Sequence, residues 1–161
     1  MEITPIGVIH TAYHAQTGTP IQGSMAGEET GTAEINPEYR DGLADLDGFS
    51  HVWLLYAFDR ARAPALHVRP YLDDRDRGVF ATRSPCRPNG IGMTAVRLLG
   101  LSGEGVLRFA GVDMLDGTPL LDIKPYIPDF DRREVERTGW YERCARGTAG
   151  RTEADARFQK P

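Results

Sequence analysis

Two arginines, a serine and an asparagine lie close together in residues 78–92, a segment that begins apolar and becomes rich in proline and glycine. Pro85 and Pro88 fix the backbone angle φ and remove two N–H donors, whereas Gly90 and Gly92 permit backbone conformations that other residues resist. A chain that holds polar groups this stiffly is suited to binding, because a site works best when its side chains are positioned in advance. The planar guanidinium of arginine matches carboxylates and phosphates, so the segment predicts a site for an anionic or polar ligand.

A second set of chemical groups lies at the end of the apolar part of the chain. Asp122, Lys124 and Tyr126 alternate with other residues, so in a strand they would share one face. That face is either a solvated surface with an ion pair or, if it looks into a cleft, a catalytic site. Asp113 precedes a turn and is predicted to contact a ligand. His51 is either a structural histidine or a further member of the site.

Several other kinds of site are disfavoured. Residues 90–95 carry alanine where the third glycine of a GxGxxG dinucleotide loop belongs, and neither a Walker loop nor a GxSxG motif is present. The four histidines and two cysteines lack the spacing of a zinc site, so no metal is predicted. The net charge of −4 argues against a bulk electrostatic nucleic-acid binder without excluding RNA as a substrate.

The elements that must hold these groups are short strands. β-Branched or apolar stretches separated by turn signals predict strands at residues 3–11, 32–35, 51–58, 66–68, 78–82, 94–99, 106–112 and 120–124. Many short strands with few convincing helices predict a mainly β, single-domain fold, an antiparallel barrel or sandwich. The near-continuous hydrophobicity of residues 51–58 indicates burial on both faces, or on one face with a partner chain on the other.

The length of 161 residues suits a single domain. Residues 3–128 are predicted to form the barrel, and residues 129–161 to form an extension with a short docked helix followed by a loosely held tail. The N-terminus lacks the pattern of a signal peptide, and no apolar run approaches the roughly 20 residues of a membrane helix. A cytoplasmic protein that does not span a membrane is therefore expected.

Several long motifs resemble those of the TsaA-like (TrmO) family. They are VFATRSP at 79–85, RPN at 87–89, GIGM at 90–93, DMLDGTP at 113–119 and DIKPY at 122–126, supported by IGVI at 6–9 and GFSHVW at 48–53. The resemblance implies a β-barrel, not a Rossmann fold, that uses S-adenosylmethionine as cofactor. It further implies N6-methylation of threonylcarbamoyladenosine next to the anticodon of tRNA, and a homodimer with the cofactor near the subunit interface.

The same resemblance implies roles for individual residues. By position, the cofactor would contact Pro20, Gln22, Asp59, Arg60, Arg83, Met93, Gly111, Val112 and Asp113. Arg83 would hold a carboxylate of the cofactor or of the substrate, and Arg87 with Asn89 would bind the substrate. The catalytic candidates are Asp122, His51, Lys124 and Tyr126; Asp122 or His51 could act as a base, although in-line positioning could suffice.

Two alternative functions remain open at this point. The chain could methylate a different small molecule or RNA, or it could bind S-adenosylmethionine without turnover. Both alternatives use the same pocket, so the residues alone do not separate them.

Overall fold

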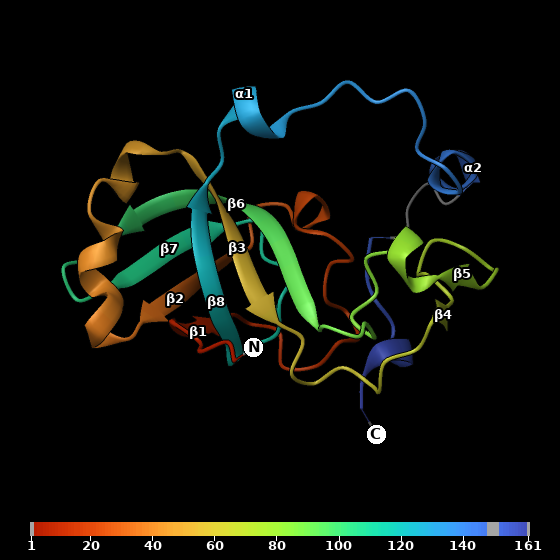
Figure 1. The fold of residues 1–161 in the computed structure, drawn as a ribbon, viewed down its shortest axis with the longest axis horizontal. Helices are drawn as coiled ribbons and strands as arrows, with labels where there is room; N and C mark the ends of the chain where they lie inside the picture. The colour runs from red at the N-terminus through yellow and green to blue at the C-terminus, as the bar shows by residue number, and fades with distance from the viewer. Residues whose placement is uncertain (1, 148–151, 161) are drawn as a thin grey trace.

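A closed antiparallel barrel forms the main body of the chain. The structure, a computed structural model, describes residues 2–147 and 152–160. The barrel strands neighbour one another in the order β1-β2-β7-β6-β3-β8 (Figure 1). They are β1 (Gly7–His10), β2 (Thr30–Ile35), β3 (His51–Ala57), β6 (Ile91–Leu101), β7 (Val106–Ala110) and β8 (Thr118–Pro125). The predicted mainly β fold and barrel are confirmed, and the sandwich alternative is excluded because the sheet closes on itself.

Alternation along β3 explains why this strand is so apolar. Val52, Leu54 and Tyr56 point into the barrel and are buried in its core, because successive side chains of a strand point to opposite faces. Trp53 and Leu55 lie on the outer face and are only partly buried. Burial on both faces within this chain is therefore wrong, and the partner chain of the other prediction stays a prediction.

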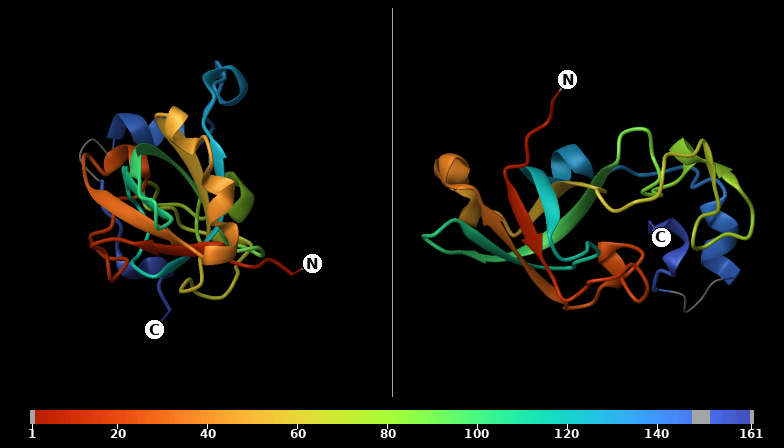
Figure 2. Two further views of the ribbon diagram at one scale, coloured as in Figure 1. Left: turned by 90° about the vertical axis from the view of Figure 1, so that its left-hand side faces the viewer. Right: turned by 90° about the horizontal axis from the view of Figure 1, so that it is seen from below.

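A smaller lobe, residues 66–87, lies beside one end of the barrel (Figure 2). It contains the two-stranded sheet of β4 (His67–Val68) and β5 (Arg77–Gly78). The strand predicted at residues 78–82 is wrong, because Val79–Ala81 forms a 3-10 helix. The backbone N–H and the hydroxyl of Thr82 both bond to the carbonyl of Val79, at 3.1 and 2.8 Å, so this turn satisfies its polar groups locally and needs no strand partner.

Trp140 and Arg157, in the C-terminal part of the chain, bind this lobe through the carbonyls of Ala81 and Pro70. The helices α1 (Pro128–Asp131) and α2 (Tyr141–Gly147) are followed by a 3-10 helix, Ala156–Phe158. Residues 152–160 are not loosely held as predicted: Glu153 bridges to Pro20, Gln159 bridges to Ala61, and the Phe158 side chain is buried. The rest of the predicted tail, residues 148–151 and 161, lies outside the described residues.

The remaining elements are short. The other 3-10 helices are Gly23–Met25, Pro37–Leu43 and Leu46–Gly48. Among the described residues, no helix has the length and hydrophobicity needed to cross a bilayer.

Candidate active site

A small cleft at the end of the barrel next to the lobe gathers most of the predicted cofactor residues. Its cavity measures about 110 Å³. Of the residues predicted to contact the cofactor, the cleft is lined by Pro20, Gln22, Asp59, Arg60, Arg83 and Asp113. They come from the 12–31 loop, the end of β3, the rigid segment and the turn before β8, four parts of the chain that only the closed barrel brings together.

A larger cavity of about 670 Å³ adjoins this cleft. The two cavities share Ile21, Gln22, Tyr71 and Arg83 as lining residues. They are therefore neighbouring parts of one binding surface, with the Arg83 guanidinium on the boundary between them.

Asp113 is the anchor of the smaller cleft. Its Oδ2 accepts a hydrogen bond from the backbone N–H of Gly23 at 2.7 Å, and its Oδ1 accepts one from the Thr94 hydroxyl at 2.8 Å. The Tyr56 hydroxyl lies 3.0 Å from Thr94 Oγ1. The Tyr56 hydroxyl also lies 3.5 Å from Asp113 Oδ1, to which it can donate. The three side chains therefore form a chain of hydrogen bonds that ends on the Asp113 carboxylate.

Burial controls the protonation of this chain of hydrogen bonds. It raises the pKa of Asp113 to about 6, although the bonds from Thr94 and Gly23 favour the ionised form. Burial also raises the pKa of Tyr56, and the nearby Asp113 charge adds to this. The carboxyl of Asp113 therefore changes charge in the mildly acidic range, whereas Tyr56 stays neutral.

Glycines allow the backbone to approach these groups closely. A Cβ at Gly23 would lie 2.6 Å from the carbonyl oxygen of Gly111 and 2.5 Å from the Thr94 methyl. Gly111 has a φ of +91°, a conformation that a residue with a side chain rarely adopts. Gly111 and Val112, both predicted to contact the cofactor, thus act here through the backbone and the core, where Val112 is buried.

The two arginines of the cleft are held differently. Within residues 2–147 and 152–160, the Arg83 guanidinium makes one hydrogen bond, from Nη1 to Gln22 Oε1 at 2.6 Å. Arg60 donates from Nη2 to the carbonyl of Asp116 at 2.6 Å, and its Nε lies 3.6 Å from Asp59 Oδ1. Arg83 therefore keeps most of its five N–H donors for a ligand, while Arg60 ties the end of β3 to the turn before β8.

Three other predicted residues lie outside the small cleft. Arg87 donates from Nη1 to the carbonyls of Val79, Thr82 and Ser84 at 3.3, 2.8 and 3.4 Å, so its visible task is to hold the rigid segment together. Asn89 is exposed beyond that segment. Met93 is 49% exposed and points outward from β6, opposite Leu55.

The predicted catalytic residues lie near one another on the outside of the barrel, away from the small cleft. Asp122 Oδ2 and Lys124 Nζ form an ion pair of 2.8 Å on the outside of β8, and the rings of His51 and Tyr126 lie 6.4 Å apart at the start of β3. Tyr56, which lines the cleft, is five residues further along β3 than His51, or ~16 Å at the usual rise of a strand. The structure does not bring these four side chains to the cleft, and the solvated ion pair is the alternative that it favours for Asp122 and Lys124.

Sequence reasoning did not single out Tyr56 and Thr94. The available signal was polarity at an inward position: each hydroxyl occupies a barrel-facing place in a strand whose other inward residues, such as Leu54 and Val96, are aliphatic. A buried hydroxyl must find a partner, and here the partner is Asp113. Separately, the part of the chain that the structure describes holds no group of three or more His, Cys, Asp or Glu side chains suited to a metal ion.

The sequence of this chain is similar to those of proteins named for S-adenosylmethionine binding and for tRNA methylation. A probable S-adenosyl-L-methionine-binding protein of Pyrococcus abyssi is 51% identical over 139 residues, 86% of this chain and 75% of that protein. The tRNA (adenine(37)-N6)-methyltransferase of Mus musculus is 43% identical over 136 residues, 79% of this chain but 31% of that protein.

The fold of this chain is also similar to that of a solved structure. The crystal structure of TrmO from Pseudomonas aeruginosa matches with a TM-score of 0.73 at 39% identity, over 87% of this chain and 62% of that one. This chain thus spans less than two thirds of that crystallised chain. The family profile described as tRNA-methyltransferase O N-terminal domain matches residues 8–132, which confirms the TsaA-like (TrmO) resemblance. The chain belongs to the tRNA-methyltransferase O N-terminal domain family.

Proposed function

We propose that this chain is an S-adenosylmethionine-dependent methyltransferase that methylates N6 of threonylcarbamoyladenosine next to the anticodon of tRNA. The observation that carries the proposal is that two opposite charges, Arg83 and Asp113, line one cleft at the barrel end. The names of the relatives support it, since one is called an S-adenosyl-L-methionine-binding protein and another a tRNA (adenine(37)-N6)-methyltransferase.

The residues of the cleft fit this cofactor. S-Adenosylmethionine carries a carboxylate, an ammonium and a sulfonium, so its site needs groups of both signs. Arg83 would hold the carboxylate and Asp113 would face positive charge, with Pro20 and Gln22 beside them. The cavity of about 110 Å³ is smaller than the roughly 300 Å³ at which ligand pockets begin, so part of the cofactor would lie outside the enclosed part of this cleft.

The chain's contribution to the reaction is mainly positioning. The bound cofactor supplies a methyl group that is already electrophilic, so the protein has to bind and orient. The four predicted catalytic side chains, His51, Asp122, Lys124 and Tyr126, lie along the outside of β3 and β8. We therefore assign no dedicated base to the cleft: alignment of the acceptor nitrogen lowers the barrier, and its N–H proton leaves to solvent.

Cofactor binding is expected to strengthen as the pH rises through about 6, the pKa of Asp113. Below this pH the carboxyl is protonated and no longer attracts a positively charged ligand, so affinity should fall by about tenfold between pH 7 and pH 5. Titration calorimetry with S-adenosylmethionine over this range measures the effect. The matched control is Asp113→Asn, which should bind weakly at every pH; a wild-type affinity that does not change with pH would contradict the assignment.

Ionisation of Asp113, which strengthens cofactor binding, lowers the stability of the fold. The folded chain holds the Asp113 proton more tightly than the unfolded chain, in which the pKa of Asp113 is near 3.8. The contribution of Asp113 to the stability of the fold therefore falls as the pH rises from about 4 through about 6. Above pH 6, Asp113→Asn is therefore expected to be at least as stable as wild type. Thermal melting of the two proteins at pH 7 checks this and separates lost binding from lost folding.

Transfer of labelled methyl groups tests the function directly. Wild-type protein should methylate tRNA that carries threonylcarbamoyladenosine and leave the same tRNA with unmodified adenosine at that position unlabelled. Methylation of another RNA or small molecule would support the first alternative function, and tight cofactor binding without any acceptor would support a binding module. An Arg83→Ala protein serves as the negative control.

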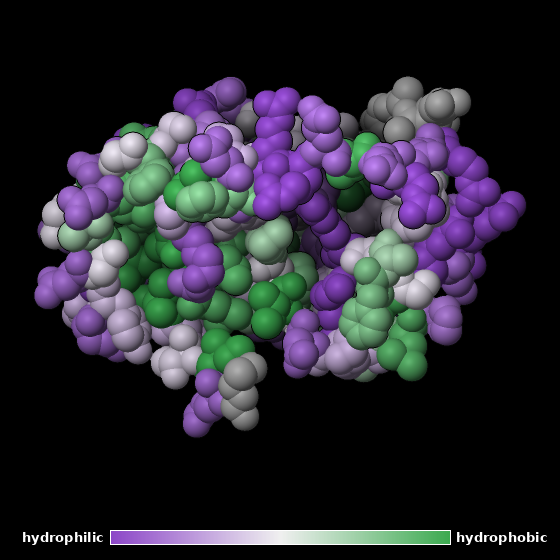
Figure 3. Space-filling view, turned by 45° about the horizontal axis from the view of Figure 1, so that its top comes forward, coloured by the Kyte–Doolittle hydropathy of each residue, from purple (hydrophilic) through white to green (hydrophobic). Residues whose placement is uncertain are grey.

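We also propose that the protein acts as a cytoplasmic homodimer. The outer face of β3 and β6 exposes Met93 and Ile91 beside partly buried Trp53 and Leu55, and the barrel side of the molecule shows a hydrophobic area broken by hydrophilic side chains (Figure 3). A partner covering this face would account for Met93, which the resemblance links to the cofactor but which lies outside the small cleft. A monomer by analytical ultracentrifugation at micromolar concentration would contradict the dimer, and a tRNA substrate supports the cytoplasmic location.

A further inference from the structure

Five aromatic residues are among those that line the larger cavity. Tyr71 and Phe80 belong to the lobe, whereas Trp140, Tyr141 and Phe158 come from the chain beyond residue 132, where the family match ends. The cavity measures about 670 Å³, within the usual range of about 300–1,000 Å³ for ligand pockets. Aromatic walls of this kind favour a flat, unsaturated ligand that can stack on them.

Trp140 is fixed in place before any ligand binds. Its Nε1 donates a hydrogen bond to the carbonyl of Ala81 at 2.7 Å, which ties it to the residue after Phe80. The Arg77 guanidinium lies 6.0 Å from its ring centroid, and Thr138 N donates to Glu142 Oε1 at 2.8 Å just before α2. A ring that is already ordered gives up less conformational entropy on binding, so Trp140 is suited to act as a stacking surface.

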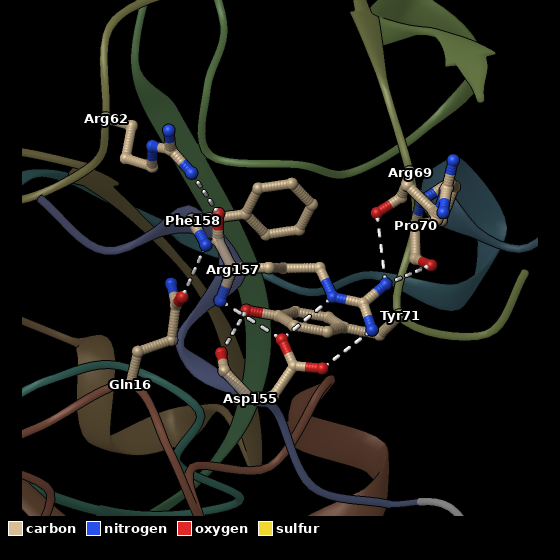
Figure 4. A network of polar contacts seen from close by, with 8 residues as sticks. All are labelled: Gln16, Arg62, Arg69, Pro70, Tyr71, Asp155, Arg157 and Phe158. Atoms are coloured by element: carbon tan, nitrogen blue, oxygen red, sulfur yellow. Dashed lines mark hydrogen bonds and ion pairs between the residues drawn. The ribbon is translucent and has the colours of Figure 1, made fainter. Parts of the chain in front are cut away.

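A polar network holds the other wall of the cavity (Figure 4). Arg157 forms an ion pair with Asp155 at 2.6 Å, donates to the carbonyl of Pro70 at 2.9 Å, and lies over the Tyr71 ring at 5.1 Å. The rings of Tyr71 and Phe158 meet edge to face at 5.0 Å. The segment 155–158 is therefore bound to the lobe through both charge and packing, and it presents Tyr71 and Phe158 to the cavity.

The same segment is connected to the smaller cleft. The backbone N–H of Phe158 donates to Gln16 Oε1 at 3.0 Å, and the backbone N–H of Gln16 donates to Gln159 Oε1 at 3.2 Å. Gln16 and Gln159 both line the smaller cleft. One structural unit thus forms the wall of the aromatic cavity and the edge of the proposed cofactor site.

We propose that the aromatic cavity (Tyr71, Phe80, Trp140, Tyr141 and Phe158) binds a purine base that has turned out of a single-stranded RNA loop; this rests on the function proposed above. A base that undergoes chemistry must leave its stack and enter a pocket beside the reacting group. The cavity lies beside the proposed cofactor site, with Gln22 and Arg83 on the shared rim.

The exposure of the rings agrees with this occupant. Phe80 is 76% exposed at the cavity, where a stacked base would cover it. Single-stranded RNA is recognised by stacking of unpaired bases on aromatic side chains, and this mode needs no large positive charge. It is therefore compatible with the net charge of −4.

The test compares RNA binding with cofactor-product binding in the full chain. The variants are Phe80→Ala and Trp140→Ala, and the matched control is Phe130→Ala on α1, another phenylalanine that is 69% exposed but does not line the cavity. The probe is an anticodon-loop hairpin RNA carrying threonylcarbamoyladenosine, measured by fluorescence anisotropy with saturating S-adenosylhomocysteine. Each cavity variant should weaken RNA binding by about 5- to 100-fold, while the control leaves it unchanged.

Titration with S-adenosylhomocysteine alone identifies the occupant. We expect its affinity to stay within about twofold of wild type in both cavity variants. A parallel loss of this affinity would assign the cavity to the adenosine of the cofactor and overturn the proposal, as would unchanged RNA affinity in both variants or no RNA binding by wild type. If methyl transfer is seen but the variants bind RNA normally, this inference fails alone; if the variants lose RNA binding but wild type transfers no methyl group, the proposed function fails instead.

A second measurement distinguishes the loss of base stacking on Trp140 from a general disturbance of the C-terminal segment. The chain has two tryptophans, so Trp53→Phe leaves Trp140 as the single source of tryptophan fluorescence. Stacking of a base on Trp140 should quench this emission in proportion to RNA binding. Binding without quenching would contradict contact between the base and Trp140.

Discussion

Replacing Arg83 with alanine is expected to weaken S-adenosylmethionine binding by about 10- to 100-fold while leaving the barrel folded. Charge-assisted hydrogen bonds contribute about 1.5–3 kcal/mol each, and Arg83 holds Gln22 through one donor while lining both cavities. The side chain is exposed and is not part of the hydrophobic core. Titration calorimetry measures the affinity, and circular dichroism with thermal melting verifies the fold.

Two matched variants make the Arg83 result specific. Arg83→Lys keeps the charge but loses the planar pair of donors, so it should recover only part of the affinity. Arg87→Ala removes the contacts to three carbonyls of the rigid segment and should lower the melting temperature, which Arg83→Ala should not do. Unchanged cofactor affinity and unchanged turnover in Arg83→Ala would rule out the proposed role of this residue.

Gly92→Ala is expected to lower the free energy of unfolding by about 2–3 kcal/mol and to impair the site with it. A Cβ at position 92 would lie 2.5 Å from Cζ and 2.8 Å from Cδ2 of the Tyr56 ring, and closer still to Cε2. Tyr56 is buried in the core and cannot move aside without losing its hydrogen bond to Thr94. Because Thr94 in turn donates a hydrogen bond to Asp113, the clash should also displace the Asp113 carboxylate in the cofactor cleft.

Urea denaturation and cofactor titration measure both effects of Gly92→Ala. The control is Gly103→Ala in the turn between β6 and β7, where an added Cβ meets no atom within 4 Å, and its stability should stay within about 0.5 kcal/mol of wild type. If Gly92→Ala were as stable as wild type and bound the cofactor equally well, the close packing of Tyr56 could not be what positions Asp113.

Much of the fold could be predicted because it depends on local patterns. Short apolar or β-branched stretches such as residues 51–58 and 106–112, with turn signals between them, indicated antiparallel β structure, and the long motifs at 79–93 and 113–126 indicated the family. The prediction of a strand at residues 78–82 was wrong because Val79–Ala81 forms a 3-10 helix whose polar groups are satisfied locally. There, Thr82 bonds to Val79 without a neighbouring strand.

The site was predictable where a short segment carries its own constraint. The prolines around Arg83 make the segment rigid whatever surrounds it, so Arg83 could be singled out from its neighbours in the sequence. Asp122 and Lys124 alternate along β8 as expected, whereas Tyr126 lies just beyond the end of that strand. A period of two does not say which face looks outward or which end of a barrel holds the cleft.

By itself, the sequence determined the mainly β class, the rigid arginine segment and the motifs of the family, because these depend on residues that are close in the chain; the barrel was implied by the resemblance to that family. Only the tertiary structure decided that Tyr56, Thr94 and Asp113 form one chain of hydrogen bonds, and that Thr138, Trp140, Tyr141 and Phe158 line the aromatic cavity. These contacts join residues far apart in sequence. They depend on strand register and on the closure of the barrel, which bring distant side chains together without leaving a local pattern that identifies the partners.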